Sequence, residues 1–210
     1  MIAIIDYGLS NLLSIKRAVE LYADCIVTNK SEDIEKADKI ILPGVGAFQY
    51  GMDRLNALNL KDVIITEANN GKALLGICLG MQMLFDNSEE GGLFEGLGLI
   101  PGSVKKISMY DLENNKQAVP HIGWEKLYVE NKNENWHNSL EDISEDSEMY
   151  FVHSYEAFPK NIENYFAYAI YGGRKVCAIA QKNNIIGCQF HPEKSGKEGL
   201  KIIRNFVQRF

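Results

Sequence analysis

The stretch Ala73-Leu74-Leu75-Gly76-Ile77-Cys78-Leu79-Gly80-Met81-Gln82-Met83-Leu84-Phe85 decides the fold. Its apolar start predicts a buried strand, and the residues from Met81 to Phe85 are good helix formers. A strand that turns sharply into a helix exposes one residue at the corner, and Gly76 and Gly80 let the backbone turn without Cβ clashes. This is a Gly-x-nucleophile-x-Gly elbow with Cys78 in the nucleophile position, where the helix dipole and free N–H groups favour a thiolate. A buried structural cysteine fits these five residues equally well, so a catalytic role for Cys78 requires a base elsewhere.

The composition is that of an ordinary globular chain, without signs of nucleic-acid or membrane binding. The 210 residues are 46% hydrophobic and 24% charged, which is enough for a substantial core. The net charge is -6 with both signs interspersed, so no basic patch indicates a nucleic-acid partner. The apolar run from Met1 to Ile5 is too short for a signal peptide or a membrane span. The four cysteines form no CxxC pair and indicate reduced thiols in a cytoplasmic protein.

The order of expected elements favours one α/β domain over residues 1–210. Strands and helices alternate in the first half, which predicts a mostly parallel sheet flanked by helices. After residue 90, glycine turns and short strands at closer intervals predict antiparallel strands. The strand candidates there are Val104 to Met109, Lys126 to Glu130, Met149 to His153, Tyr165 to Tyr171, Val176 to Gln181 and Ile185 to Phe190. A last helix is expected from about Lys197 to Phe210, and the polar segment from Asn131 to Ser147 is expected to be a surface excursion.

His191-Pro192-Glu193 supplies a candidate base at the end of an expected strand. Proline biases the preceding residue toward extended backbone, in which positions i and i+2 point the same way. Glu193 can then accept a hydrogen bond from the His191 ring and stabilise the imidazolium, as the acid of a nucleophile–base–acid triad does. Alone, such a string more often marks a solvated loop. Together with the Cys78 elbow it predicts thiol acyl-transfer chemistry.

A second glycine-rich turn, Pro43-Gly44-Val45-Gly46, follows the expected strand from Lys39 to Leu42. Ligands of open α/β sheets gather at the carboxyl ends of the strands, so N–H groups of this turn are candidates for holding an oxyanion. A phosphate-binding turn is a weaker alternative, because the Lys-Ser/Thr pair of a P-loop is missing. A plain strand–helix turn remains equally compatible.

The histidines give no metal-binding pattern. They stand at positions 121, 137, 153 and 191 and have no two-to-five-residue spacing to one another, so a zinc site is not expected. We therefore expect neither a metal nor another cofactor.

Together, these motifs resemble the class I (triad) glutamine amidotransferases. The resemblance rests on Gly76–Gln82, His191–Glu193 and the Pro43–Gly46 turn. Further stretches resemble the glutaminase subunits of imidazole glycerol phosphate synthases, over nearly the whole chain. They are Met1–Gly8, Pro43–Phe48, Gly96–Gly102, Pro120–Trp124, Tyr150–Tyr155 and Gln189–Ser195. The resemblance implies the flavodoxin-like mixed sheet of that class.

The resemblance also implies a reaction, the hydrolysis of glutamine to glutamate and ammonia. Cys78 would attack the side-chain amide, and His191, oriented by Glu193, would pass the proton to the leaving ammonia. The oxyanion would be held by N–H groups of Leu79 and of the turn formed by Val45 and Gly46. The positions that match substrate-binding ones are Gln82, Ser154 and Tyr155.

A partner subunit is implied as well. Ammonia would pass to a (β/α)8-barrel synthase subunit in a heterodimer, which forms imidazole glycerol phosphate and AICAR in histidine biosynthesis. The residues expected at the interface or along the ammonia passage are His121, Trp124 and Glu125.

Two departures from the family pattern concern the partner. Gly8-Leu9-Ser10-Asn11 stands where Gly-Ala-Gly-Asn is usual, and Glu125 where Asn is usual. A buried carboxylate is costly when unpaired, so Glu125 predicts a complementary Lys or Arg on the partner.

A paralogous glutaminase that supplies ammonia for a surface or flagellar sugar stays open as an alternative. So do a non-catalytic interaction protein on the same fold, against which the intact triad argues, and a thiol peptidase.

Overall fold

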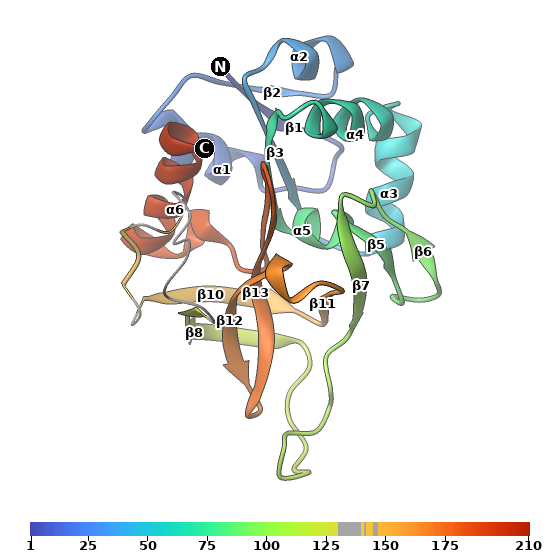
Figure 1. Cartoon of the computed structure of the whole chain (residues 1–210), viewed down its shortest axis with the longest axis vertical. Helices are drawn as coiled ribbons and strands as arrows, with labels where there is room; N and C mark the ends of the chain where they lie inside the picture. Colours follow the sequence, from blue (N-terminus) through green and yellow to red (C-terminus); the bar gives the residue numbers. More distant parts are fainter. Residues whose placement is uncertain (130–139, 141, 145–146) are drawn as a thin grey trace.

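An eight-stranded sheet forms the centre of the molecule in the computed structural model (Figure 1). Its strand order is β2-β1-β3-β4-β14-β13-β12-β9. The strands from β2 to β14 run parallel, and each later neighbour pairs antiparallel. Their bounds are β1 Ile2–Ile5, β2 Cys25–Thr28, β3 Lys39–Gly44, β4 Ala73–Cys78, β9 Tyr128–Val129, β12 Tyr165–Tyr171, β13 Arg174–Lys182 and β14 Ile185–Cys188. The sheet has the mixed, mostly parallel form that the sequence predicts.

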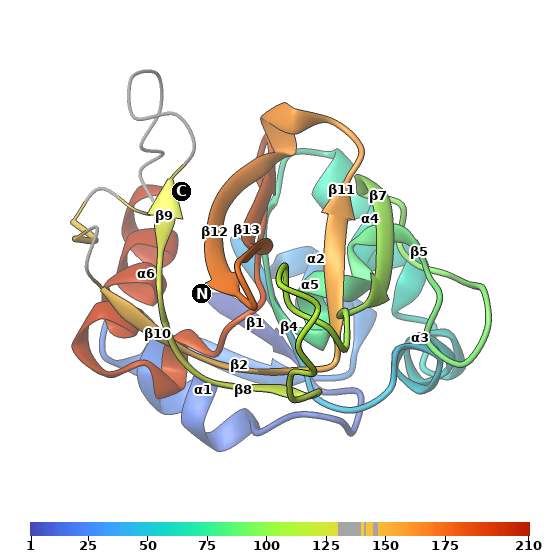
Figure 2. The same cartoon turned by 90° about the horizontal axis from the view of Figure 1, so that it is seen from below.

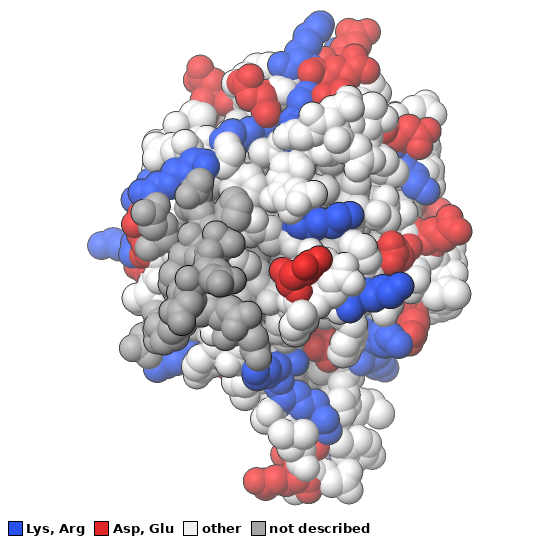
Figure 3. Space-filling view, viewed as in Figure 1, with Lys and Arg blue, Asp and Glu red and all other residues white. Residues whose placement is uncertain are grey.

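The structure describes residues 1–129, 140, 142–144 and 147–210. Most of the expected surface excursion from Asn131 to Ser147 therefore lies outside the described residues, and so does His137. Over the described ranges, no helix combines the length and apolar character needed to cross a membrane. On the face shown in Figure 3, basic and acidic side chains are interspersed, as they are along the sequence.

Two hydrophobic cores lie on the two faces of the sheet, because side chains alternate along each strand. On β1, Ile2 and Ile4 belong to one core and Ile5 to the other. The helices that cover the first face are α1 (Leu12–Glu20) and α6 (Gly196–Arg209). Those on the second face are α2 (Ser31–Lys36), α3 (Phe48–Ala57), α4 (Lys61–Asn69) and α5 (Leu79–Met83), as Figure 1 shows. Strand β4 is buried along its whole length, so Cys78 lies at the end of a rigid strand.

Two smaller sheets are built from the second half of the chain. One joins β11 (Tyr155–Pro159), β7 (Ile100–Lys106), β5 (Phe85–Ser88) and β6 (Phe94–Glu95) in that order. The other pairs β8 (His121–Lys126) with β10 (Glu148–His153), which run side by side in Figure 2. Two single-turn helices complete the fold, η1 (Ile162–Asn164) and η2 (Pro192–Lys194). The antiparallel register of β8 and β10 sets His121 opposite His153, which matters below.

The start of β7 differs from the sequence prediction. The strand begins at Ile100 instead of Val104. Its first residues are not predicted from the sequence because Pro101 and Gly102 are typical of turns. Gly102 has φ +141°, and a Cβ there would lie 2.3 Å from the carbonyl oxygen of Phe158 on β11. Glycine thus permits close contact of two strands at a position where it looks like a turn.

The sequence also misses four strands, β5, β6, β8 and β11. α5 ends at Met83, so Phe85 starts β5 instead of ending the helix. The expected strand from Lys126 to Glu130 is divided, since Lys126 ends β8 and β9 begins at Tyr128; Glu130 lies outside the described residues. β8 is missed because its alternation of polar, apolar and glycine residues lacks the β-branched run that predicts strands.

Candidate active site

Cys78 occupies the corner between β4 and α5, and its own backbone takes the unusual conformation there, with φ 54° and ψ -110°. Such angles are rare for a non-glycine residue and persist only where the surroundings impose them. The flanking glycines permit close packing. A Cβ on Gly76 would lie 2.8 Å from the Gly80 carbonyl oxygen, and one on Gly80 would lie 1.8 Å from that of Leu42. The glycines are predicted to relieve the turn, but in the structure they let the backbone of α5 lie directly against β3 and β4.

His191 and Glu193 lie in direct contact. The distance between His191 Nδ1 and Glu193 Oε1 is 2.8 Å, and the two side chains are 4% and 1% exposed. His191 is extended, as expected from the proline after it, but Pro192, Glu193 and Lys194 form the η2 turn. Glu193 therefore reaches the ring through a helical turn, and the expected i, i+2 alternation of an extended chain is wrong. The hydrogen bond leaves Nε2 as the ring atom available for chemistry.

The electrostatics of this pair favour the imidazolium. Burial lowers the pKa of His191, but the adjoining Cys78 and the Glu193 carboxylate outweigh burial and raise that pKa to about 9. Among the described residues, neither His191 Nε2 nor Glu193 Oε2 has a hydrogen-bond partner, although both atoms are buried. The unpaired Glu193 oxygen keeps negative charge next to the His191 ring. This charge stabilises the protonated ring, as is needed if His191 carries a proton during catalysis.

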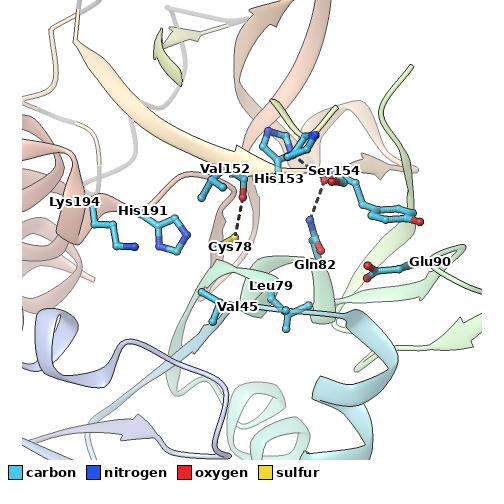
Figure 4. A pocket seen from close by; sticks show the side chains of 13 residues that line it. Val45, Cys78, Leu79, Gln82, Glu90, Val152, His153, Ser154, His191 and Lys194 are labelled. Atoms are coloured by element: carbon cyan, nitrogen blue, oxygen red, sulfur yellow. Dashed lines mark hydrogen bonds between the residues drawn. The ribbon is translucent and has the colours of Figure 1, made fainter. Parts of the chain in front are cut away.

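The loop that carries His191 is held to β10 by hydrogen bonds to the backbone of Tyr150. The His191 N–H donates to the Tyr150 carbonyl at 3.0 Å, and the Ser195 hydroxyl donates to the His191 carbonyl at 2.7 Å. The same hydroxyl accepts the Tyr150 N–H at 2.9 Å. The Cys78 sulfur lies 4.0 Å from the Val152 carbonyl oxygen on the same strand (Figure 4). β10 thus aligns the histidine loop with the nucleophile.

The Pro43–Gly46 turn is shaped by residues that follow β1. The Tyr7 hydroxyl donates to the Pro43 carbonyl at 2.7 Å, and the Val45 N–H donates to the Leu9 carbonyl at 2.8 Å. Val45 lines the site, but its own N–H is already hydrogen-bonded to Leu9. Gly46, with φ +105°, follows it and contributes the next N–H group. The first residue of α5, Leu79, has no carbonyl of its own helix to bond. Gly46 and Leu79 thus remain as the candidate oxyanion donors.

A cavity of about 350 Å³ brings these groups together. Its walls include all but one of the residues predicted for catalysis, oxyanion binding and substrate binding: Val45, Gly46, Cys78, Leu79, Gln82, Ser154, Tyr155 and His191. Glu193 lies behind the His191 ring. The sequence reasoning missed the remaining wall residues, which are Glu90, Pro120, Val152, His153 and Lys194. Figure 4 shows the charged ends of Glu90 and Lys194 on opposite sides of Cys78.

Gln82 and Glu90 give the cavity its polar character. Gln82 Nε2 donates to the Tyr155 carbonyl at 2.9 Å and to Gln189 Oε1 at 3.0 Å, which leaves the amide oxygen for a ligand. Glu90 Oε2 accepts the Phe48 N–H at 2.7 Å, which fixes a carboxylate at the cavity wall. No sequence signal singles out Glu90, because one acidic residue in the Ser-Glu-Glu-Gly-Gly turn is indistinguishable from a solvated one.

The residues predicted for the partner interface separate into two groups. Trp124 is 52% exposed and Ile122 on the same strand is 60% exposed. His121 is fully buried and stacks on Tyr171 at 3.9 Å between ring centroids, so its side chain forms no part of the surface. The Glu125 side chain is 30% exposed, and its Oε1 lies 3.2 Å from His121 Nε2. This carboxylate thus has a contact within the chain, and the complementary Lys or Arg on another subunit stays a prediction.

In the part of the chain that the structure describes, no three His, Cys, Asp or Glu side chains are grouped to hold a metal ion. The site that the structure does present brings together a thiol at a strand–helix corner, a buried His–Glu pair, a glycine turn and a polar cavity.

The chain belongs to the class I glutamine amidotransferases, whose family pattern it matches over residues 3–210. It is 44% identical over 209 residues to the imidazole glycerol phosphate synthase subunit HisH 1 of Legionella pneumophila (strain Lens), covering 99% of this chain and 98% of that protein. It is 45% identical over 209 residues to the subunit HisH of Staphylococcus aureus (strain bovine RF122 / ET3-1), covering 99% and 97%. Within its class, the chain is therefore a member of the HisH group.

Solved structures share the fold at low sequence identity. A crystal structure of a glutamine amidotransferase superposes with a TM-score of 0.70 at 18% identity and covers 98% of this chain and 96% of its own. The glutaminase domain of Trypanosoma brucei CTPS with bound acivicin gives 0.65 at 16% identity, covering 98% and 91%. These likenesses concern the fold alone, and they confirm the predicted fold class.

Proposed function

We propose that this chain is the glutaminase subunit of an imidazole glycerol phosphate synthase, a single domain over residues 1–210 that acts in the cytoplasm. It hydrolyses glutamine and delivers the ammonia to a (β/α)8-barrel partner in a heterodimer, for histidine biosynthesis. The observation that carries the proposal is the joint placement of Cys78, the His191–Glu193 pair and the glycine turn at Gly46 around one cavity. The full-length similarity to HisH subunits supports the choice of pathway.

The reaction proceeds through a thioester. The Cys78 sulfur attacks the side-chain carbonyl carbon of glutamine, and the Gly46 and Leu79 N–H groups stabilise the oxyanion. The imidazolium of His191 gives its proton to the leaving ammonia, and the ring then takes a proton from the water that hydrolyses the thioester. Glu193 holds the ring by Nδ1, so that Nε2 faces the reacting atoms. Glutamate is released and the starting state is restored.

Glu90 binds the substrate's α-ammonium group in this scheme. Its carboxylate is held at the cavity wall by the Phe48 N–H. Glu90→Gln keeps the shape but removes the charge, so KM for glutamine is expected to rise about 10- to 100-fold while kcat changes little, because a hydrogen bond to a charged group is worth about 1.5–3 kcal/mol. Steady-state glutamate release measures both constants. An unchanged KM in Glu90→Gln would contradict this binding mode, and Glu89→Gln, the neighbouring exposed carboxylate, serves as the matched control.

The partner is proposed to dock on β8, where the exposed Trp124 and Ile122 present apolar surface next to the cavity wall at Pro120. Large aromatic side chains of this kind are typical anchors of protein interfaces. Docking there would place an acceptor site close to the point where ammonia leaves.

The test is glutamate release by the chain alone, with the histidine-pathway barrel subunit of the same cell, and with that subunit plus an acceptor analogue. We expect the chain alone to be nearly idle, because the partner favours an inward Gly46 N–H, and one oxyanion donor is worth about 10²–10³ in rate. Stimulation only by a barrel of a sugar pathway would contradict the histidine assignment. Equal rates with and without any partner would contradict a partner-controlled oxyanion turn.

A further inference from the structure

A hydrogen-bonded chain runs from β8 to the glutamine cavity through two buried histidines. Glu125 Oε1 lies 3.2 Å from His121 Nε2, and His121 Nδ1 lies 3.0 Å from His153 Nε2. His153 Nδ1 lies 2.9 Å from the Tyr155 carbonyl oxygen. His121 is fully buried and His153 is 5% exposed. The antiparallel register of β8 and β10 places the two rings opposite each other.

The same chain continues to the nucleophile. The Tyr155 carbonyl that faces His153 also accepts the Gln82 amide, at 2.9 Å. Gln82 donates in turn to Gln189 Oε1 at 3.0 Å, and Gln189 Nε2 lies 3.8 Å from the Cys78 sulfur. The orientation of Gln82, which lines the cavity, therefore depends on a carbonyl that His153 holds in place.

Counting hydrogens shows that two neutral rings do not complete this chain. A carbonyl oxygen stands at one end and a carboxylate at the other, and both are acceptors. With three contacts to satisfy, three hydrogens are required, whereas two neutral imidazoles supply two. One further proton, on His121 or on Glu125, makes every contact a hydrogen bond. Without it, two acceptors face each other at one of the three contacts, either a ring nitrogen and an oxygen or the two ring nitrogens.

The surroundings decide where that proton is held. Burial lowers the pKa of His153 to about 3, so His153 is neutral and donates from Nδ1 to the Tyr155 carbonyl. His153 Nε2 then accepts from His121 Nδ1, and the extra proton lies between His121 Nε2 and Glu125. Burial also lowers the pKa of His121, and Glu125 opposes that shift. Two other titratable groups face the chain. Tyr171 of β12 is stacked on His121, and the charge of His191 further lowers the pKa of His153.

We propose that Glu125, His121 and His153 are positioning residues for the glutamine cavity, and that one extra proton, carried by His121 against the Glu125 carboxylate, completes their chain. With the proton, the chain fixes the Tyr155 carbonyl and, through it, Gln82. When the proton leaves as the pH rises, one contact of His121 becomes repulsive, and the His153 ring that holds the Tyr155 carbonyl, and through it Gln82, is no longer fixed. This inference rests on the proposed function in one respect, namely that the cavity binds glutamine.

Two substitutions at Glu125 separate this role from a merely structural one. In Glu125→Gln, the side-chain amide donates a hydrogen to His121 Nε2, so two neutral rings complete the chain without an extra proton. In Glu125→Ala, the end of the chain has no side-chain partner at any pH. Trp124→Ala, on the same strand but at an exposed position, is the matched control for effects on β8 or on the proposed partner surface.

The first measurement is the ¹⁵N chemical shift of the histidine rings in the full chain, at about pH 5 and about pH 8, values that bracket the ordinary pKa of histidine. We expect His153 to carry its hydrogen on Nδ1 in every variant. At the lower pH, His121 is expected to be doubly protonated in the wild type and Trp124→Ala. In Glu125→Gln it is a neutral Nδ1–H ring. A hydrogen on His153 Nε2, or the same His121 state in wild type and Glu125→Gln, would overturn the proposal.

The second measurement is glutamine binding by calorimetry in a Cys78→Ala background, where no turnover occurs. Because His191 and the substrate's amino group titrate alike in all variants, the readout is the ratio of the wild-type Kd to that of Glu125→Gln. The ratio is expected to rise from about 1 at about pH 5 to about 10 at about pH 8, and Glu125→Ala is expected to bind about 10-fold more weakly than Glu125→Gln at both pH values. A constant ratio, or a Trp124→Ala effect equal to that of Glu125→Ala, contradicts the positioning role. Failure of every variant to bind glutamine contradicts the proposed function instead, and the ring shifts then decide on the chain by themselves.

Discussion

The Cys78→Ala variant is expected to lose glutamine hydrolysis completely, a fall in kcat of about 10⁶-fold or to the background rate, as for removal of the nucleophile in a serine protease. No other thiol can replace it. Cys177 and Cys188 are fully buried in the core, and burial raises the pKa of each thiol. Cys25 lies on β2, and burial likewise raises its pKa. Glutamate release by the complex with its partner measures the loss.

Two controls belong to this variant. Synthesis driven by added ammonium salt should persist in the Cys78→Ala complex, because the acceptor site lies on the partner. A glutamine-like electrophile should add its mass once to the wild type, at Cys78, and leave the variant unmodified. Wild-type glutamate release from Cys78→Ala would remove this residue from the mechanism.

The elbow and the triad could be predicted from the sequence because their signals are local. Gly76, Cys78 and Gly80 lie within five residues, and His191 and Glu193 are neighbours in the chain. Pattern reasoning also gave the parallel half of the sheet, where hydrophobic runs and helices alternate. It gave the right contact between His191 and Glu193 for a wrong local reason, since a helical turn replaces the expected extended segment.

What the sequence could not provide depends on contacts between distant segments. Glu90 comes to the cavity because its carboxylate caps the Phe48 N–H across 42 positions. His121 and His153 meet through a strand pair of which only β10 was predicted. The bond from Val45 to Leu9 is equally non-local, and it decides which N–H of the turn is free. Spacing rules detect none of these pairings, because each depends on how the sheets are joined.

The Glu193→Gln variant is expected to keep its fold and lower kcat by about 10⁴-fold, the loss seen when the orienting acid of a serine protease triad becomes an amide. The Glu193 side chain is 1% exposed, and its Oε1 is 2.8 Å from His191 Nδ1. An amide that turns its NH₂ toward Nδ1 selects the ring tautomer with the hydrogen on Nε2, and that tautomer cannot take a proton there. An amide that turns its oxygen toward Nδ1 buries an NH₂ group where Oε2 has no hydrogen-bond partner among the described residues. Either orientation lowers the rate, whereas KM is expected to change less.

The pH dependence of the same variant gives an independent check with a definite sign. The folded-state pKa of His191 is raised from 6.5 to about 9, with Cys78 and Glu193 as the causes that outweigh burial. The imidazolium therefore stabilises the fold fully below about pH 6.5, and this contribution is lost as the pH rises through about 9. Removing the Glu193 charge lowers that pKa, so both the alkaline fall in kcat and the alkaline fall in stability are expected to move to lower pH. Rate profiles and urea unfolding of wild type and Glu193→Gln across this range measure the two shifts. If the alkaline falls of wild type and Glu193→Gln occur at the same pH, Glu193 does not stabilise the charged ring. Its contact with Nδ1 would then be structural only.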